Sequence, residues 1–135
     1  MAHRHPIRVY YSDTDAGRIV YHARYLDFAE HARTELLRAA GKEKGTHKRL
    51  MDEHHVAYVV KSITIEYHAP AELDDLLIVE TTIEQARRFS VTFLQRVLRD
   101  EQELATLHVR IASVNLDTRK VEPFEPWFAE EASKF

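Results

Sequence analysis

Two carboxylates stand close together in a short polar segment near the start of the sequence. Asp13 and Asp15 lie within residues 12–17, where Ser, Thr, Asp and Gly favour a loop between a β-rich run and a helix-like one. A carboxylate on a loop between two regular elements is well placed to act as a general base or a nucleophile. Asp and Gly also form ordinary turns, and we expect Asp13 to stabilise the loop rather than to supply a second acid.

The helix that follows this loop lacks a conventional N-cap. None of residues 19–22, which precede Ala23, is a Ser, Thr, Asp or Asn, the residues whose side chains usually accept the first free N–H groups of a helix. Such N–H groups carry partial positive charge and can stabilise an oxyanion that forms during a reaction. Water can cap the same groups, so an oxyanion site is one of two interpretations.

This part of the sequence resembles a known family. The run YYSDTDAG at residues 10–17, the run VYHARY at 20–25 and the helical residues Phe28, Glu30 and 32–37 are similar to the signature of the YbgC-type thioesterases. These are relatives of 4-hydroxybenzoyl-CoA thioesterase. The likeness covers almost the whole chain, because it continues through three further stretches, at residues 66–71, 73–75 and 115–117.

The resemblance implies a thioester hydrolase (EC 3.1.2.-) that acts on acyl-CoA or acyl carrier protein thioesters, with no metal and no cofactor. By position, Asp15 is its catalytic carboxylate, as nucleophile or general base, and the helix N-terminal amide at His22 polarises the thioester carbonyl. The implied fold is the hotdog fold, in which an antiparallel β-sheet wraps around one long α-helix. Two subunits pair in this fold to complete the active sites.

Four residues near Asp15 are candidates for lining the substrate pocket. Tyr11 and Tyr21, together with the His22 side chain, are expected to line the pocket or orient water, although packing or capping explains them equally well. Arg18 departs from the family, which usually has a small residue at this position. A bulky cation there would narrow the pocket or contact the substrate.

Arg87 and Arg88 are further candidates, in a predicted turn between two strands. Relatives often place polar or basic residues there, near the phosphates of CoA, and a guanidinium suits a phosphate ligand. The alternative is a solvated turn without a ligand.

The elements that position these residues follow from the periodicity of the sequence. A strand is predicted over residues 7–11, a helix over 23–40 from apolar residues three and four apart, and a shorter helix over 46–53. Gly41 is expected to end the long helix as a left-handed cap.

Four strands are predicted after the helices, over residues 59–67, 76–86, 89–98 and 104–116. In the first of them Val59, Ile63, Ile65 and Tyr67 are expected to share a face. Short turns between the strands favour an antiparallel sheet with one helix packed on it, an α+β fold in a single domain over residues 1–135.

One sheet on one helix leaves an edge uncovered, so we expect a homodimer or homotetramer. Trp127 and Phe128 follow Pro123 and Pro126, which cannot continue a central strand. These two aromatic side chains are therefore expected to pack at an edge or in a partner interface.

Composition excludes several classes of function. A net charge of −3 without a basic stripe argues against nucleic-acid binding, and the absence of cysteine excludes disulfides and cysteine nucleophiles. The histidines at 3, 5, 54 and 55 lack a complete ligand set for a metal. No apolar run approaches the roughly 20 residues of a membrane span, and the first residues lack the pattern of a secretory signal, so a cytoplasmic protein is expected.

Two other functions compete with hydrolysis. A hotdog hydratase or dehydratase is one, although such relatives generally place an Asp or Glu and a His differently along the helix. The other is a non-catalytic protein that binds acyl carrier protein or an envelope complex, as the family's link to the Tol-Pal system permits. Hydrolysis of a panel of CoA esters separates the second from the enzymes.

Overall fold

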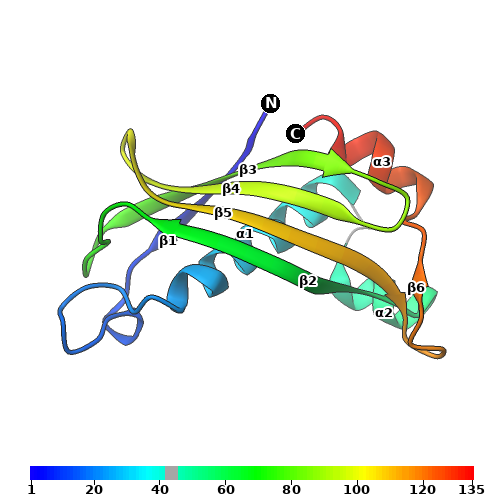
Figure 1. Cartoon of the computed structure of the whole chain (residues 1–135), viewed down its shortest axis with the longest axis horizontal. Coiled ribbons are helices and arrows are strands. Elements are labelled where there is room, and N and C mark those ends of the chain that lie inside the picture. The colour runs from blue at the N-terminus through cyan, green and yellow to red at the C-terminus, as the bar shows by residue number, and fades with distance from the viewer. Residues whose placement is uncertain (42–45) are drawn as a thin grey trace.

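A computed structural model of the chain describes residues 1–41 and 46–135 (Figure 1). The helices are α1 (Arg24–Gly41), α2 (His47–His54) and α3 (Pro126–Ala132). The strands, in chain order, are β1 (His3–Arg8), β2 (Val56–Tyr67), β3 (Leu76–Ala86), β4 (Val91–Arg99), β5 (Gln102–Asn115) and the short β6 (Val121–Glu122).

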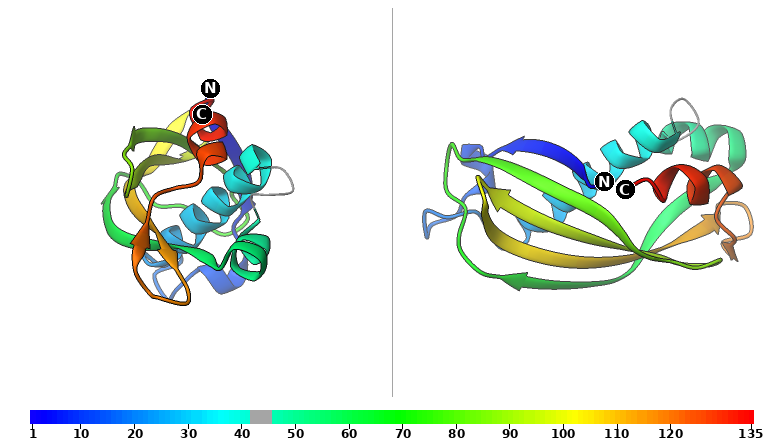
Figure 2. Two further views of the ribbon diagram at one scale, coloured as in Figure 1. Left: turned by 90° about the vertical axis from the view of Figure 1, so that its right-hand side faces the viewer. Right: turned by 90° about the horizontal axis from the view of Figure 1, so that it is seen from above.

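The strands form one antiparallel sheet in the order β1-β3-β4-β5-β2, and β6 pairs with β5. The sheet curves around α1, which lies in its concave face (Figure 2). This arrangement confirms the predicted α+β hotdog fold. The strands β1 and β2 are the two ends of the order, so each has one edge without a neighbour in the described chain.

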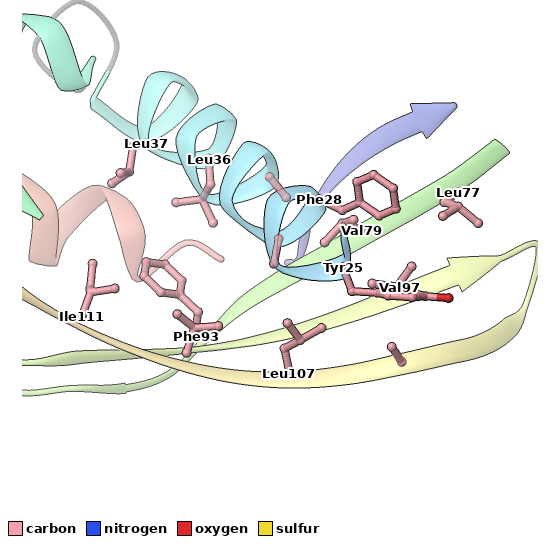
Figure 3. Packing of buried hydrophobic residues seen from close by; sticks show 14 of the residues in the cluster. Tyr25, Phe28, Leu36, Leu37, Leu77, Val79, Phe93, Val97, Leu107 and Ile111 are labelled. Carbon is pink, nitrogen blue, oxygen red and sulfur yellow. The ribbon is translucent and has the colours of Figure 1, made fainter. Parts of the chain in front are cut away.

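The core lies between α1 and the sheet because one stripe of α1 is apolar. Residues three and four apart on the helix are buried there, and Figure 3 shows several of them facing the side chains of β3, β4 and β5. Phe28, Leu36 and Leu37 lie on the helix side, and Phe93 and Leu107 lie on the sheet side. The first turn of α1, next to the candidate catalytic loop, is therefore held on a rigid core.

Polar residues buried beneath α1 form one hydrogen-bonded group. Arg33 is only 8% exposed. Its Nη1 donates to Gln95 Oε1 at 3.0 Å. Gln95 Nε2 donates to the Ala29 carbonyl at 2.9 Å and to Thr81 Oγ1 at 3.0 Å. Burial lowers the pKa of Arg33 to about 10, so the guanidinium is still charged at neutral pH and depends on Gln95 for a partner.

The first strand begins earlier than predicted. It spans His3–Arg8 rather than residues 7–11, because residues 3–8 pair along β3 with Pro6 opposite Ile78. A proline is tolerated in β1 because this is an edge strand. Tyr11 instead begins a 3₁₀ turn and is exposed.

The expected common face of β2 is also wrong in part. Pairing with β5 shifts between Val60 and Ser62, so that Lys61 forms a bulge. Because of the extra residue, Val60 lies opposite the buried Ile111, whereas Val59 falls on the other face. After the bulge the alternation proceeds as predicted, and Ile63, Ile65 and Tyr67 share the inner face.

Gly41 does not serve as a left-handed cap. It is the last residue of α1, it is buried, and no described glycine has a positive φ. A Cβ at this position would lie 2.8 and 2.9 Å from two ring carbons of Trp127. Gly41 is therefore needed for the close approach of α3, in which Trp127 packs on α1 of its own chain and Phe128 is buried.

We expect Gly41→Ala to lower the free energy of unfolding by about 1–3 kcal/mol, the usual cost of overpacking. Alanine is favoured over glycine in a helix by about 1 kcal/mol, but the Trp127 ring cannot easily move away, since its Nε1 donates to Glu125 Oε2 at 2.5 Å. Urea denaturation measures the change. In a Trp127→Leu background the same substitution should be neutral or stabilising, and a gain of stability in the wild-type background would contradict the prediction.

Candidate active site

The Asp15 loop is closed by its own backbone. Thr14 and Val20 form a β-bridge, and the N–H of Asp15 donates to the Ile19 carbonyl at 3.1 Å. The Gly17 N–H donates to Asp15 Oδ1 at 2.8 Å, and a Cβ on Gly17 would lie 3.1 Å from the same oxygen. Among the described residues, nothing donates to the second oxygen, Oδ2. Asp15 is thus oriented through one oxygen and presents the other to solvent or substrate.

Asp13 stabilises this loop, as predicted. Its Oδ2 accepts the Tyr10 N–H at 2.8 Å, its Oδ1 lies 3.5 Å from Arg24 Nε, and its carbonyl accepts the Tyr21 N–H at 2.9 Å. These contacts connect the loop to the first turn of α1.

Arg18 has a left-handed backbone, with φ of 66°. Every residue with a Cβ loses roughly 1–2 kcal/mol in this conformation, which only glycine adopts without strain. The Arg18 guanidinium has no acceptor in the described part of the chain. The loop therefore holds, three residues after Asp15, a cation that has no partner in the described chain.

Within the described chain, the two N–H groups just before α1 are free, whereas the first N–H of the helix itself is bonded. The Arg24 N–H donates to the Tyr21 carbonyl at 2.9 Å, but the N–H groups of His22 and Ala23 have no acceptor among the described residues. Because a peptide is planar and trans, its C=O and N–H point in opposite directions. With the Tyr21 carbonyl directed at Arg24, the His22 N–H points away from α1.

Two cavities meet at Asp15. The first, of about 390 Å³, is mostly apolar and is lined by Asp15, Ile19, Val20, His22, Tyr25, Tyr67, His68, Ala69 and Pro70. The second, of about 460 Å³, is lined by Tyr11, Thr14, Asp15, Arg18, Glu72 and Leu73. A ligand with an apolar part and a charged part could therefore lie across Asp15.

The structure brings most of the predicted site residues to these two cavities. Tyr11 and Arg18 line the second cavity with Asp15, and His22 lines the first. Tyr21 lines neither cavity, but its ring lies 4.5 Å from that of His22 and is exposed at the same loop.

Arg87 and Arg88 lie at the other end of the sheet, in the turn between β3 and β4 (Figure 1). The Asp15 loop adjoins the start of β3, where the Val20 N–H donates to the Ala71 carbonyl at 2.9 Å. The 11 residues of β3, at about 3.3 Å each, separate the two places. Within one chain, the two arginines do not reach Asp15.

Two tyrosines of the first cavity were not predicted as site residues. The Tyr67 hydroxyl donates to the His22 carbonyl at 2.7 Å, and the Tyr25 hydroxyl accepts the Ala71 N–H at 3.1 Å. Burial raises the pKa of both phenols, so both are protonated at neutral pH. Alternation along β2 indicated the inward direction of Tyr67 but gave no sign of its contact with residue 22.

In the described ranges, no three His, Cys, Asp or Glu side chains gather as metal ligands. No helix in the same ranges is both long and apolar enough to cross a membrane.

Sequence comparison identifies a superfamily and close relatives. A profile of the thioesterase-like superfamily matches residues 9–131. The acyl-CoA thioesterase YbgC of Haemophilus influenzae is 45% identical over 119 residues, which cover 88% of this chain and 85% of that protein. The long-chain acyl-CoA thioesterase FadM of Escherichia coli is 32% identical over 114 residues, or 82% of each chain.

Structural comparison agrees. A Bartonella henselae protein described as a probable thioesterase matches with a TM-score of 0.87 and 33% identity, over 93% of this chain and 100% of that one. A 1,4-dihydroxy-2-naphthoyl-CoA thioesterase from Synechocystis matches with a TM-score of 0.88, over 98% and 96% of the two chains. At 22% identity, the second likeness supports the fold alone.

The fold and these relatives together define a thioesterase of the hotdog class. Within the thioesterase-like superfamily, the chain belongs to the YbgC-type family.

Proposed function

We propose that this protein hydrolyses acyl-CoA thioesters, with Asp15 as the catalytic carboxylate and the His22 N–H as an oxyanion donor. One observation carries the proposal: Asp15 and His22 line the same cavity, and neither Asp15 Oδ2 nor the His22 N–H has a partner among residues 1–41 and 46–135. The names of the YbgC relatives support the substrate class.

Two routes use these groups. In the first, Asp15 takes a proton from water, the hydroxide attacks the thioester carbon, and the tetrahedral oxyanion accepts the His22 N–H. The intermediate then expels the thiolate of CoA, which takes up a proton. In the second, Asp15 attacks the carbon itself, the CoA thiolate leaves and takes up a proton, and water hydrolyses the resulting anhydride to the carboxylic acid and free Asp15. Single turnover in H₂¹⁸O identifies the second route when ¹⁸O appears in Asp15, because water that attacks the anhydride at the Asp15 carbonyl leaves its oxygen there, whereas the first route puts ¹⁸O only in the product.

The apolar cavity suits the acyl group, and the cavity that holds Arg18 suits the polar side of the leaving group. Arg18 and Tyr11 are then substrate contacts on the leaving-group side, and Tyr21 lies at the rim.

A hydrolysis screen tests the proposal. Short, long and aromatic acyl-CoAs, and the same acyl groups on acyl carrier protein, are incubated with the protein, and free thiol is measured. Release of thiol with carboxylic acid as the product supports hydrolysis. Binding without release would favour a non-catalytic acyl carrier protein or envelope-complex partner, and hydration of an enoyl-CoA would favour a hydratase.

We also propose a homodimer, or a homotetramer built from such dimers, in which the free edges of two β2 strands pair. The exposed Val59 lies on this edge strand, and an open edge favours pairing with a second chain. A two-fold axis reverses the second copy, so that its β3–β4 turn lies at the end of the assembly that holds Asp15. Arg87 and Arg88 of the second copy then reach the CoA phosphates.

Since acyl-CoA is made inside the cell, the cytoplasm is the proposed compartment.

The combined variant Arg87→Ala, Arg88→Ala is expected to raise KM for acyl-CoA about tenfold, because charge-assisted bonds to phosphate are lost. The change in kcat should be smaller, and added salt should reproduce the effect in the wild type. Steady-state kinetics measure both constants. Arg119→Ala, in another exposed turn, is the matched control. An equal rise of KM for a thioester without phosphates would show that the two arginines do not bind the CoA phosphates and only lie in a solvated turn.

A further inference from the structure

We propose that Tyr67 is a positioning residue that fixes the backbone at His22 and thereby the direction of the oxyanion donor. This inference rests on the proposed hydrolysis at Asp15. Tyr67 is the last residue of β2 and is 48% exposed, yet its hydroxyl donates to the His22 carbonyl at 2.7 Å across 45 positions of sequence. The sheet thus holds the start of α1 through one side-chain hydrogen bond.

Both peptide planes that flank His22 are fixed by hydrogen bonds. On one side, the Tyr21 carbonyl accepts the Arg24 N–H at 2.9 Å. On the other, the His22 carbonyl accepts the Tyr67 hydroxyl. The His22 N–H lies in the first of these planes and the Ala23 N–H lies in the second, so Tyr67 restrains the Ala23 N–H directly and the His22 N–H only through the backbone of residue 22. Without the hydroxyl, only the plane before His22 is held.

Tyr67 itself is held in place. Its ring lies edge-on to that of Tyr25, with 5.4 Å between centroids and 80° between planes. Tyr25 is 2% exposed, and its hydroxyl accepts the Ala71 N–H at 3.1 Å. In the sheet, Tyr67 lies opposite the buried Ala105. The buried Tyr25 and Ala105 therefore hold the ring and the backbone of Tyr67, and they set the position of its hydroxyl.

The hydroxyl acts through the backbone and not on the substrate. Its proton is directed at the His22 carbonyl, and burial together with Tyr25 raises the pKa of Tyr67, so the phenol stays protonated. A hydrogen bond to a peptide carbonyl also strengthens the N–H of the same peptide as a donor. That N–H belongs to Ala23, which has no acceptor in the described chain and is the next free donor after His22.

Tyr67→Phe removes only this hydroxyl and is expected to lower kcat about tenfold, less than the roughly hundredfold or more that the loss of a whole oxyanion donor costs, because the donors stay in place and lose one restraint. KM should stay within about twofold, because the ring still lines the cavity. Tyr58→Phe is the matched control: it lies on the same strand, and its buried hydroxyl has no partner among the described residues. Its kcat should equal that of the wild type.

A second readout separates positioning from a merely structural role and from hydrolysis itself. The ¹H–¹⁵N amide signals of His22 and Ala23 should shift in Tyr67→Phe and stay in place in Tyr58→Phe, with the melting temperatures of both unchanged. Unaltered amide signals, or a wild-type kcat in folded Tyr67→Phe, would overturn the inference. If the wild type hydrolyses no thioester, the proposed function fails, and the amide signals still decide the role of Tyr67.

Discussion

Asp15→Asn is expected to lower kcat by at least about a hundredfold, the usual scale for a general base or nucleophile. The amide has nearly the same size, and its oxygen can still accept the Gly17 N–H that Oδ1 accepts now at 2.8 Å. The fold should therefore survive, while the negative charge at Oδ2 is lost. Thiol release from an acyl-CoA at saturating concentration measures kcat, and circular dichroism checks the fold.

Asp13→Asn is the matched control, since it lies in the same loop and also replaces a carboxylate by an amide. Asp13 contacts Tyr10 and Arg24 and lines neither cavity at Asp15, so its loss of charge should cost much less than that of Asp15. Near-wild-type turnover by folded Asp15→Asn would remove Asp15 from the mechanism.

Gln95→Leu is expected to lower the free energy of unfolding by about 3 kcal/mol, the order found when a buried charge loses its partner. Gln95 Oε1 is the acceptor for the Arg33 guanidinium at 3.0 Å, and no carboxylate among the described residues lies within ion-pair distance of Arg33. Leucine fills a similar volume, so the loss is one of polar contacts and not of packing. Urea denaturation with far-UV circular dichroism as the signal measures it.

The combined variant Arg33→Met, Gln95→Leu separates the buried charge from other causes. Replacing the whole polar group by apolar side chains removes the charge that Gln95→Leu leaves unpaired, so most of the lost stability should return. If the double variant is as unstable as the sum of the two single changes, the cost lies in packing and the electrostatic explanation is wrong.

Periodicity was enough to predict the long helix, the second helix and the later strands, because one buried face repeats every 3.6 or 2 residues. It failed where a distant segment decides the local structure. The bulge at Lys61 follows from pairing with β5, and β1 extends to His3 because β3 offers partners there. Gly41 was predicted to be a helix cap, but glycine is required there because the ring of Trp127, from α3, leaves no room for a Cβ.

The candidate site divides in the same way. Asp15 and the N–H groups at His22 are near one another in the chain, so the sequence alone places them together, while their catalytic roles come from the family resemblance and stay predictions. The contact of Tyr67 with His22 joins the end of a strand to the start of a helix, and no local pattern encodes it. The sequence also predicted the turn that contains Arg87 and Arg88. Its distance from Asp15 depends on how the strands are arranged in the sheet, which no local pattern shows.

The two edges of the sheet bear on aggregation. An open strand edge can recruit further chains without limit, as in fibrils. Here β1 contains Pro6, which has no N–H to offer a further strand, and β2 contains the charged Lys61 at its bulge. Pairing through β2 would leave only proline-containing edges outside. Growth by strand addition would then end with a closed pair, so the same strand that joins two copies would also keep the protein from forming longer polymers.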